Sequence, residues 1–256
     1  MKKFAITGNP VNHSKSPALF QAAYGSSCKM KYILMSAQSA GEAIALFNGN
    51  ELCGMNVTAP FKTDILEYID ERSNEVIVIG AANTIVKTDK GQLKAYNTDY
   101  IGVSETFAEF GVHLTARRCL LLGIGGAGKA AAYAIAKAGG HLTIANRTIA
   151  KAEEFADKTE VKVVGLNQLE KVLGNFDIIV NTLYPSIDFI EKTWLHANQI
   201  VMDASYTGSP LLDKAARRGC RCIDGRYWIL HQAIPAFELF TGQKPDIETM
   251  RQVLNL

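Results

Sequence analysis

A glycine-rich turn between an apolar strand and an alanine-rich helix constrains the fold of this chain more than any other feature. The turn, residues 123–128, reads GIGGAG, follows a predicted strand at 119–122 and opens a predicted helix at 129–137. This is the GxGxxG spacing in the strand–turn–helix context of dinucleotide-binding sites, where the backbone approaches a pyrophosphate at a helix N-terminus. The alternative is a turn that only packs helix against strand. The residues expected to bind the dinucleotide are Gly123, Gly125, Gly126 and Ala127.

The end of the next predicted strand, His141–Ala145, indicates which dinucleotide is bound. Enzymes that prefer NAD usually place an acidic residue here for the ribose hydroxyls. This chain has Asn146, Arg147 and Thr148 there and Lys151 one helical turn later, with no Asp or Glu between residues 139 and 152. A guanidinium and an ammonium can hold a 2′-phosphate through charge-assisted hydrogen bonds. The pattern predicts NADP as the cofactor; the alternative is that Arg147 is only a solvated surface charge.

Charge and composition exclude several classes of protein. Of 256 residues, 48% are hydrophobic and 20% charged, so the chain can bury a large core and is not a disordered protein. The 27 basic and 25 acidic residues leave a net charge of +2. A nucleic-acid partner would favour a strongly basic face, so the balance argues against one. A small-molecule substrate is expected instead.

Targeting and metal signals are also missing from the sequence. The longest uncharged stretch is 13 residues, Ser16 to Cys28, shorter than the roughly 20 apolar residues of a membrane span. The N-terminal residues resemble a short strand rather than a signal peptide. The five cysteines form no CxxC pair and the five histidines no metal-binding spacing. We therefore expect reduced thiols, no metal and a cytoplasmic protein that is a monomer or a homodimer.

Short apolar runs alternate with helical patterns along nearly the whole chain, which predicts α/β architecture with mostly parallel sheets. Residues 1–99 contain predicted strands, two helices and a hairpin turn at Thr88–Gly91. Residues 100–225 show the pattern of a doubly wound, Rossmann-type domain. Residues 226–256 are mostly helical and can pack back on the first domain, which is then discontinuous. The strands expected are Phe4–Thr7, Tyr32–Met35, Met55–Val57, Ala82–Val86, Leu93–Tyr96, Cys119–Leu122, His141–Ala145, Lys162–Val164, Asp177–Val180, Gln199–Asp203 and Arg221–Ile223, with helices at Ser39–Phe47, Asp64–Ile69, Tyr100–Phe110, Trp228–Phe240 and Ile247–Leu254.

Four polar clusters occupy loop positions in the first domain. They are HSKSP from His13, NVTAPFK from Asn56, GAANT from Gly80 and YNTD from Tyr96. Any one of them could be a turn or helix cap. Together they suit a polyhydroxylated ligand, because each ligand hydroxyl needs a donor or acceptor once water is excluded.

Seven motifs in the same order along the chain resemble those of the shikimate/quinate dehydrogenase family. They are GNPVNHSKSP from Gly8, NVTAPFK from Asn56, GAANT from Gly80, NTDYIG from Asn97, GIGGAGKA from Gly123, NRT from Asn146 and DGRYWILHQAIPAF from Asp224. The resemblance spans almost the whole chain. It implies reversible, NADPH-dependent reduction of 3-dehydroshikimate to shikimate, a step of chorismate and aromatic amino acid biosynthesis, in a cleft between a substrate domain and a nucleotide domain.

The resemblance also implies roles for individual residues. Lys62 and Asp99 match the catalytic pair, and Gly225 matches a residue beside the nicotinamide. Residues matching substrate-binding positions are Ser14, Ser16, Thr58, Asn83, Tyr206 and Gln232. The chemistry suits the pair, since an ammonium can stabilise and protonate the oxygen of a ketone as hydride arrives. The alternatives are an exposed lysine after Pro60 and an N-cap for the following helix.

Some positions depart from the family pattern. After Asn181 the chain reads Thr-Leu-Tyr-Pro instead of a run of small residues, and bulky Trp228 follows Arg226-Tyr227 near the expected nicotinamide site. Ala204 stands where Met is common, and Phe240 where Trp is common. Other hypotheses therefore stay open: a quinate/shikimate paralogue with altered substrate or cofactor preference, an oxidoreductase with another substrate, or an inactive nucleotide-binding regulatory module. Retention of Lys62 and Asp99 argues against the last.

Overall fold

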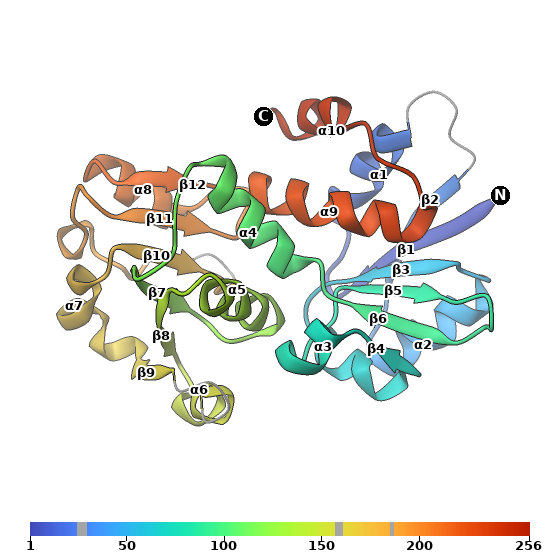
Figure 1. The fold of residues 1–256 in the computed structure, drawn as a ribbon, viewed down its shortest axis with the longest axis horizontal. Coiled ribbons are helices and arrows are strands. Elements are labelled where there is room, and N and C mark those ends of the chain that lie inside the picture. Colours follow the sequence, from blue (N-terminus) through green and yellow to red (C-terminus); the bar gives the residue numbers. More distant parts are fainter. Residues whose placement is uncertain (25–29, 157–160, 185–186) are drawn as a thin grey trace. The chain divides into compact units, whose positions relative to one another are not determined.

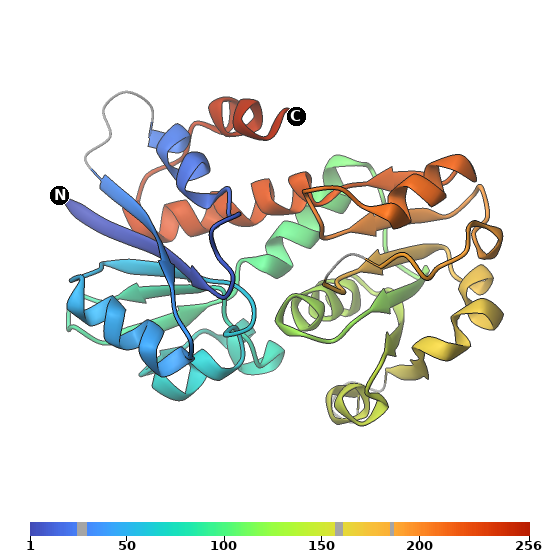
Figure 2. The ribbon, with the colours of Figure 1, turned by 180° about the vertical axis from the view of Figure 1, so that it is seen from behind.

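The computed structural model describes residues 1–24, 30–156, 161–184 and 187–256. The chain divides into two compact units (Figures 1 and 2). Unit 1 is Met1–Gly102 with Leu230–Leu256, and unit 2 is Val103–Ile229. The α/β class and the return of the C-terminal helices to the first part of the chain are confirmed. The two boundaries fall inside the helices α4 (Asp99–Glu109) and α9 (Gly225–Thr241).

Unit 1 is built on a mixed sheet of order β2-β1-β3-β5-β6-β4. β1 pairs with β2 and β3 in parallel, and β5 pairs with β3 and β6 antiparallel. Gly91 has φ +81° and closes the predicted β5–β6 hairpin, which is confirmed. The strands are β1 (Lys2–Gly8), β2 (Met30–Ser36), β3 (Gly54–Val57), β4 (Glu71–Arg72), β5 (Thr84–Lys87) and β6 (Leu93–Tyr96).

Helices cover both faces of this sheet. Alternation along β1 sends Ala5 to one face, in a core with Phe47 of α2 and Ile65 of η2, and Phe4 to the other. On that second face lies α1, and α10 packs beside α1 (Figure 1), joined to it by a bond from the Thr249 hydroxyl to the Ala22 carbonyl. The helices are α1 (Ser16–Tyr24), α2 (Ala40–Gly49), η2 (Asp64–Tyr68), α3 (Asn74–Ile79) and α10 (Ile247–Leu254).

An aromatic cluster holds the C-terminal part of the chain on unit 1. Phe240 of α9 stacks on Phe4 of β1 with ring centroids 4.8 Å apart, and Phe20 of α1 lies 5.6 Å from Phe240. Phe237, one turn earlier on α9, lies 6.0 Å from Phe20. All four side chains are buried. The apolar surface they remove from water stabilises the packing of α9 on this sheet.

Unit 2 contains a fully parallel sheet of order β12-β11-β10-β7-β8-β9, the doubly wound arrangement predicted from the sequence. One face shares a core with α7 and α8, while α5 contacts β7 and β8. The strands are β7 (Arg118–Leu122), β8 (His141–Asn146), β9 (Lys162–Gly165), β10 (Ile178–Asn181), β11 (Ile200–Asp203) and β12 (Arg221–Ile223). The helices are α5 (Gly126–Lys137), α6 (Ile149–Ala156), η3 (Leu166–Gln168), α7 (Leu169–Val172), η4 (Leu173–Asn175), η5 (Lys192–Trp194) and α8 (Pro210–Arg217).

Two local predictions differ from the structure. The segment expected as a helix at Asp64–Ile69 is a single short 3₁₀ helix. The strand expected from Ala82 begins at Thr84, because the Ala82 N–H donates to the Lys62 carbonyl at 2.8 Å. Between β10 and β11, the described residues contain one helical element, the 3₁₀ helix η5. Pro185 lies outside the described residues.

Membrane, metal and thiol features can be stated for the described part of the chain. There, no helix is long and apolar enough to cross a bilayer. The same residues contain no group of three or more His, Cys, Asp or Glu side chains that could hold a metal ion. Cys53, Cys119, Cys220 and Cys222 are free thiols, and burial raises the pKa of Cys119 to about 12. Cys28 lies outside the described residues.

Truncation of Phe240 tests the aromatic cluster. Phe240→Ala removes a stacked, buried ring and should lower the free energy of unfolding by about 3–5 kcal/mol. Urea unfolding followed by circular dichroism measures this. The control Ile77→Ala, at a side chain that is 64% exposed on α3, should stay within about 0.5 kcal/mol of wild type. A loss below about 1 kcal/mol for Phe240→Ala would contradict the importance of the cluster.

Candidate functional site

Four loops of unit 1 meet at one edge of its sheet. β1 and β3 both end there, because Thr7 pairs with Val57 in a parallel ladder. β5 begins and β6 ends at the same edge, because Thr84 pairs antiparallel with Asn56 and with Tyr96. The four polar clusters predicted from the sequence therefore follow or precede strands at a common edge.

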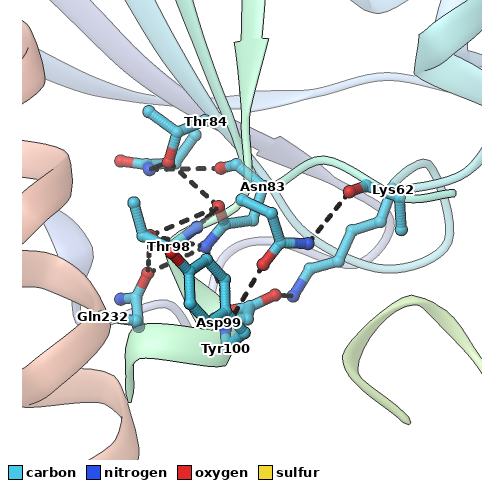
Figure 3. A network of polar contacts seen from close by, with 10 residues as sticks. Lys62, Asn83, Thr84, Thr98, Asp99, Tyr100 and Gln232 are labelled. Carbon is cyan, nitrogen blue, oxygen red and sulfur yellow. Dashed lines mark hydrogen bonds and ion pairs between the residues drawn. The ribbon is translucent and has the colours of Figure 1, made fainter. Parts of the chain in front are cut away.

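Lys62 and Asp99 form an ion pair at this edge. Lys62 Nζ lies 2.5 Å from Asp99 Oδ2 (Figure 3), and the two side chains are only 14% and 8% exposed. Lys62 stands in the turn after β3, where its carbonyl accepts the Ala82 N–H, and Asp99 is the first residue of α4. Removing two charges from water is costly unless they are paired and hydrogen-bonded. The side chain of Lys62 is therefore not a solvated surface lysine.

Asn83 connects this ion pair to α9. Its Nδ2 lies 3.0 Å from Asp99 Oδ1, 2.8 Å from Thr98 Oγ1 and 3.2 Å from Gln232 Oε1 (Figure 3). Its Oδ1 accepts the Thr98 N–H at 2.7 Å. Lys62, Asn83, Asp99 and Gln232, all predicted as site residues, thus belong to one hydrogen-bonded network.

Ser14 lies in the turn before α1, and Ser16 is the first residue of that helix. Ser14 Oγ and Ser16 Oγ are 3.2 Å apart, and the Ser16 N–H donates to Ser14 Oγ. Thr58 lies at the end of β3, where its N–H donates to the Thr7 carbonyl and its methyl group packs against Gly8. Hydroxyls at these two strand ends can bind a carboxylate and ring hydroxyls of a ligand.

The glycine turn of unit 2 fits a dinucleotide. Gly123 has φ +93°, and a Cβ at Gly128 would collide with the Gly123 carbonyl, so both positions favour glycine. A Cβ at Gly125 would meet nothing within 4 Å, so this N-cap of α5 is open on its outer side. The first turn of α5, including Gly126 and Ala127, has neither an acidic residue nor a side-chain cap. Its N–H groups can accordingly face an anion.

Thr182, just after β10, holds this turn in place. Its hydroxyl lies 2.9 Å from the Leu122 carbonyl and 3.2 Å from the Gly123 carbonyl. A Cβ at Gly123 would come within 2.8 Å of Leu183. Thr182 and Leu183, which depart from the family pattern, therefore pack directly against the dinucleotide turn.

The basic residues predicted to bind the ribose phosphate are exposed at the end of β8. Arg147, Thr148 and Lys151 all have exposed side chains. Asn146 Nδ2 donates to the Thr148 carbonyl at 2.8 Å and closes the turn that carries Arg147. Exposed cationic groups on a fixed turn can bind a phosphate without a large desolvation cost.

Tyr206 lies on the loop after β11, and Gly225 is the first residue of α9, just after β12. Burial raises the pKa of Tyr206, and the nearby Tyr184 raises it further. A Cβ at Gly225 would come within 2.7 Å of the Ser205 carbonyl. The close packing of the backbone is therefore enough to require glycine at this position. Arg226 forms a bidentate pair with Asp224, and Trp228 is only 5% exposed.

Sequence reasoning missed a buried carboxylate that ties two strand ends of unit 2 together. Asp203 accepts bonds from Asn181 Nδ2 at 3.0 Å, from Ser209 Oγ at 2.6 Å and from the Ser205 N–H at 2.8 Å. Ser209 also caps α8. In unit 1 it missed Tyr32, whose hydroxyl donates to Asn56 Oδ1 at 2.7 Å. Neither residue stands in a local motif that marks such a role.

Three family models match successive parts of the chain. The model described as the shikimate dehydrogenase substrate binding domain matches residues 6–85. Residues 105–215 match the model for shikimate / quinate 5-dehydrogenase, and residues 230–254 match the shikimate 5'-dehydrogenase C-terminal domain. The first and third matches fall in the two segments of the discontinuous unit 1, and the second match falls in unit 2.

Individual relatives match over the full length. The shikimate dehydrogenase (NADP(+)) of Pyrococcus abyssi is 33% identical over 260 residues, covering 99% of this chain and 97% of its own. The crystal structure of shikimate dehydrogenase from Aquifex aeolicus has a TM-score of 0.92 at 29% identity, covering 100% and 98% of the two chains. The Thermus thermophilus enzyme, solved in complex with NADP(H) and shikimate, has a TM-score of 0.90 at 30% identity, covering 100% and 99%. The chain belongs to the shikimate dehydrogenase family.

Proposed function

We propose that this chain is an NADP-dependent shikimate dehydrogenase that reversibly reduces 3-dehydroshikimate to shikimate, a step of chorismate and aromatic amino acid biosynthesis. The observation that carries the proposal is the ion pair of Lys62 and Asp99, with 2.5 Å between Nζ and Oδ2, inside a polar network at the end of three strands. The names of full-length relatives support the same activity. Neither an inactive regulatory module nor another oxidoreductase is favoured by a specific observation.

In this proposal the two units have separate tasks. Unit 1 binds the substrate through the hydroxyls and amides of Ser14, Ser16, Thr58, Asn83 and Gln232. Unit 2 binds NADP through the glycine turn, with Asn146, Arg147, Thr148 and Lys151 at the 2′-phosphate. Tyr206 contributes to the substrate carboxylate and Gly225 borders the nicotinamide. A cytoplasmic location is proposed with it, supported by the four free thiols in the described residues.

Lys62 is the proton donor for ketone reduction in this account. Bound NADPH supplies a hydride to the carbonyl carbon, and one proton must then reach the carbonyl oxygen. The Lys62 ammonium stabilises the negative charge that develops on that oxygen and transfers a proton to it. Asp99 holds the ammonium in place and remains hydrogen-bonded to Asn83 after the transfer. The reverse reaction uses the same groups, with neutral Lys62 accepting the proton from the shikimate hydroxyl.

A panel of two substrates and two cofactors tests the proposed function. With NADP as cofactor, the purified protein should oxidise shikimate with a higher kcat/KM than quinate. With shikimate as substrate, kcat/KM should be higher for NADP than for NAD. Both reactions are followed by the absorbance of the reduced nicotinamide. Recognition of the 2′-phosphate by charged hydrogen bonds of about 1.5–3 kcal/mol predicts an NADP preference of roughly 10- to 100-fold. No turnover of shikimate would overturn the proposal. A preference for quinate or NAD would instead indicate the paralogue with altered specificity.

Removal of the ammonium tests the role of Lys62. Lys62→Ala should lower kcat by roughly 10²–10⁴-fold, the usual contribution of a positioned proton-transfer group. The Kd for NADPH, measured by fluorescence titration, should stay within about twofold, because the dinucleotide contacts belong to unit 2. Lys94→Ala is the matched control, since Lys94 of β6 pairs with Glu71 on the edge strand β4 of the same sheet. Near-normal kcat in Lys62→Ala would refute the assigned role.

A further inference from the structure

Two buried polar residues that contact Asn83 have no role in the mechanism above. Asn56 on β3 and Thr84 on β5 stand directly opposite each other in the antiparallel ladder. Asn56 is 5% exposed and Thr84 is fully buried. A buried amide and hydroxyl cost free energy unless they are hydrogen-bonded. Their bonds run toward Asn83, and hence toward Asp99.

The donors and acceptors in this part of the network have a definite direction. Asn56 Nδ2 donates to Thr84 Oγ1 at 3.0 Å and to the Asn83 carbonyl at 3.2 Å. Because a hydroxyl has one proton, the Thr84 oxygen that accepts from Asn56 directs its own proton to Asn83 Oδ1 at 3.1 Å. The Thr84 hydroxyl therefore identifies Oδ1 as the atom of the Asn83 amide that faces β5.

This direction decides what Asn83 presents to the carboxylate. With Oδ1 held by the Thr84 hydroxyl and by the Thr98 N–H, Nδ2 faces Asp99 Oδ1 at 3.0 Å (Figure 3). A flipped amide would place its oxygen against the Asp99 carboxylate and its NH₂ group against the Thr98 N–H. Both contacts would be repulsive, and the proton of the Thr84 hydroxyl would face an NH₂ group, so Thr84 and Thr98 together favour the orientation that supports Asp99 as an acceptor.

The same chain of bonds begins at Tyr32. The Tyr32 hydroxyl donates to Asn56 Oδ1 at 2.7 Å, which leaves Asn56 Nδ2 to face Thr84. A hydrogen-bonded path thus runs from Tyr32 through Asn56, Thr84 and Asn83 to Asp99.

We propose that Thr84 is a positioning residue for the reaction: its hydroxyl, oriented by Asn56, sets the Asn83 amide so that Asp99 is held in place against Lys62. The inference rests on the proposed function and adds a residue to it. In the network drawn in Figure 3, Thr84 is bonded to neither Lys62 nor Asp99. It acts on Asp99 through Asn83.

Thr84→Val tests this role because it removes the hydroxyl and keeps the shape of the side chain. Without this hydroxyl the Asn83 amide is less firmly held against the Asp99 carboxylate, so kcat for shikimate should fall at least about tenfold. Thr84→Ser keeps the hydroxyl and should recover most of the rate. Thr143→Val makes the same change at a buried strand position of unit 2 and should leave kcat within about twofold. If Thr84→Val does not fold, Thr84→Ala supplies the variant without a hydroxyl.

A double-mutant cycle separates positioning from simple loss of packing. If Thr84 acts through Asp99, Thr84→Val should cost less than about twofold in kcat when Asp99 is already replaced by Asn. The Kd for NADPH should be unchanged in every variant. Wild-type protein without shikimate turnover would overturn the proposed function and this inference together. If the wild type is active, any of three results would overturn this inference alone. The first is an unchanged kcat in Thr84→Val, and the second is no recovery of kcat in Thr84→Ser. The third is that Thr84→Val causes the same loss of kcat in the Asp99→Asn background as in the wild type.

Discussion

A lysine and an aspartate that are both shielded from water must stay together, since either charge alone would be strongly destabilising in that position. Lys62 and Asp99 are far apart in the sequence: Lys62 follows β3 and Asp99 begins α4. Their meeting depends on the antiparallel pairing of β3, β5 and β6, which brings the two strand ends to one edge. The ion pair can therefore form only because the sheet has this topology.

The discontinuity of unit 1 follows from the same site. Gln232 reaches the network from α9, and Phe237 and Phe240, farther along that helix, pack in the aromatic cluster on the sheet. One helix therefore supplies both a polar contact to Asn83 and a large part of a hydrophobic core. Rigid support from a packed helix is what a polar group needs if it is to hold a fixed orientation.

Much of this arrangement could be predicted from the sequence, and the exceptions have physical reasons. The glycine turn and the strand–helix alternation carry local signals, so the parallel sheet of unit 2 and its doubly wound pattern were predictable. Lys62 and Asp99 were predicted from motifs, but only the structure gives the 2.5 Å between them. The hydrogen bonds from Asn56 and Thr84 to Asn83 arise because cross-strand register places Asn56 opposite Thr84, which the sequence does not show. Tyr32 and Asp203 act through contacts that are distant in sequence, so no local pattern identifies them.

A crystal structure of the protein with bound shikimate tests the central claim most directly. The account predicts that the C3 hydroxyl of shikimate lies about 2.6–3.2 Å from Lys62 Nζ and within hydrogen-bonding distance of Asp99, the reach that proton transfer requires. It also predicts the carboxylate at the hydroxyls of Ser14 and Ser16. A complex in which that hydroxyl contacts neither Lys62 nor Asp99 would contradict the account.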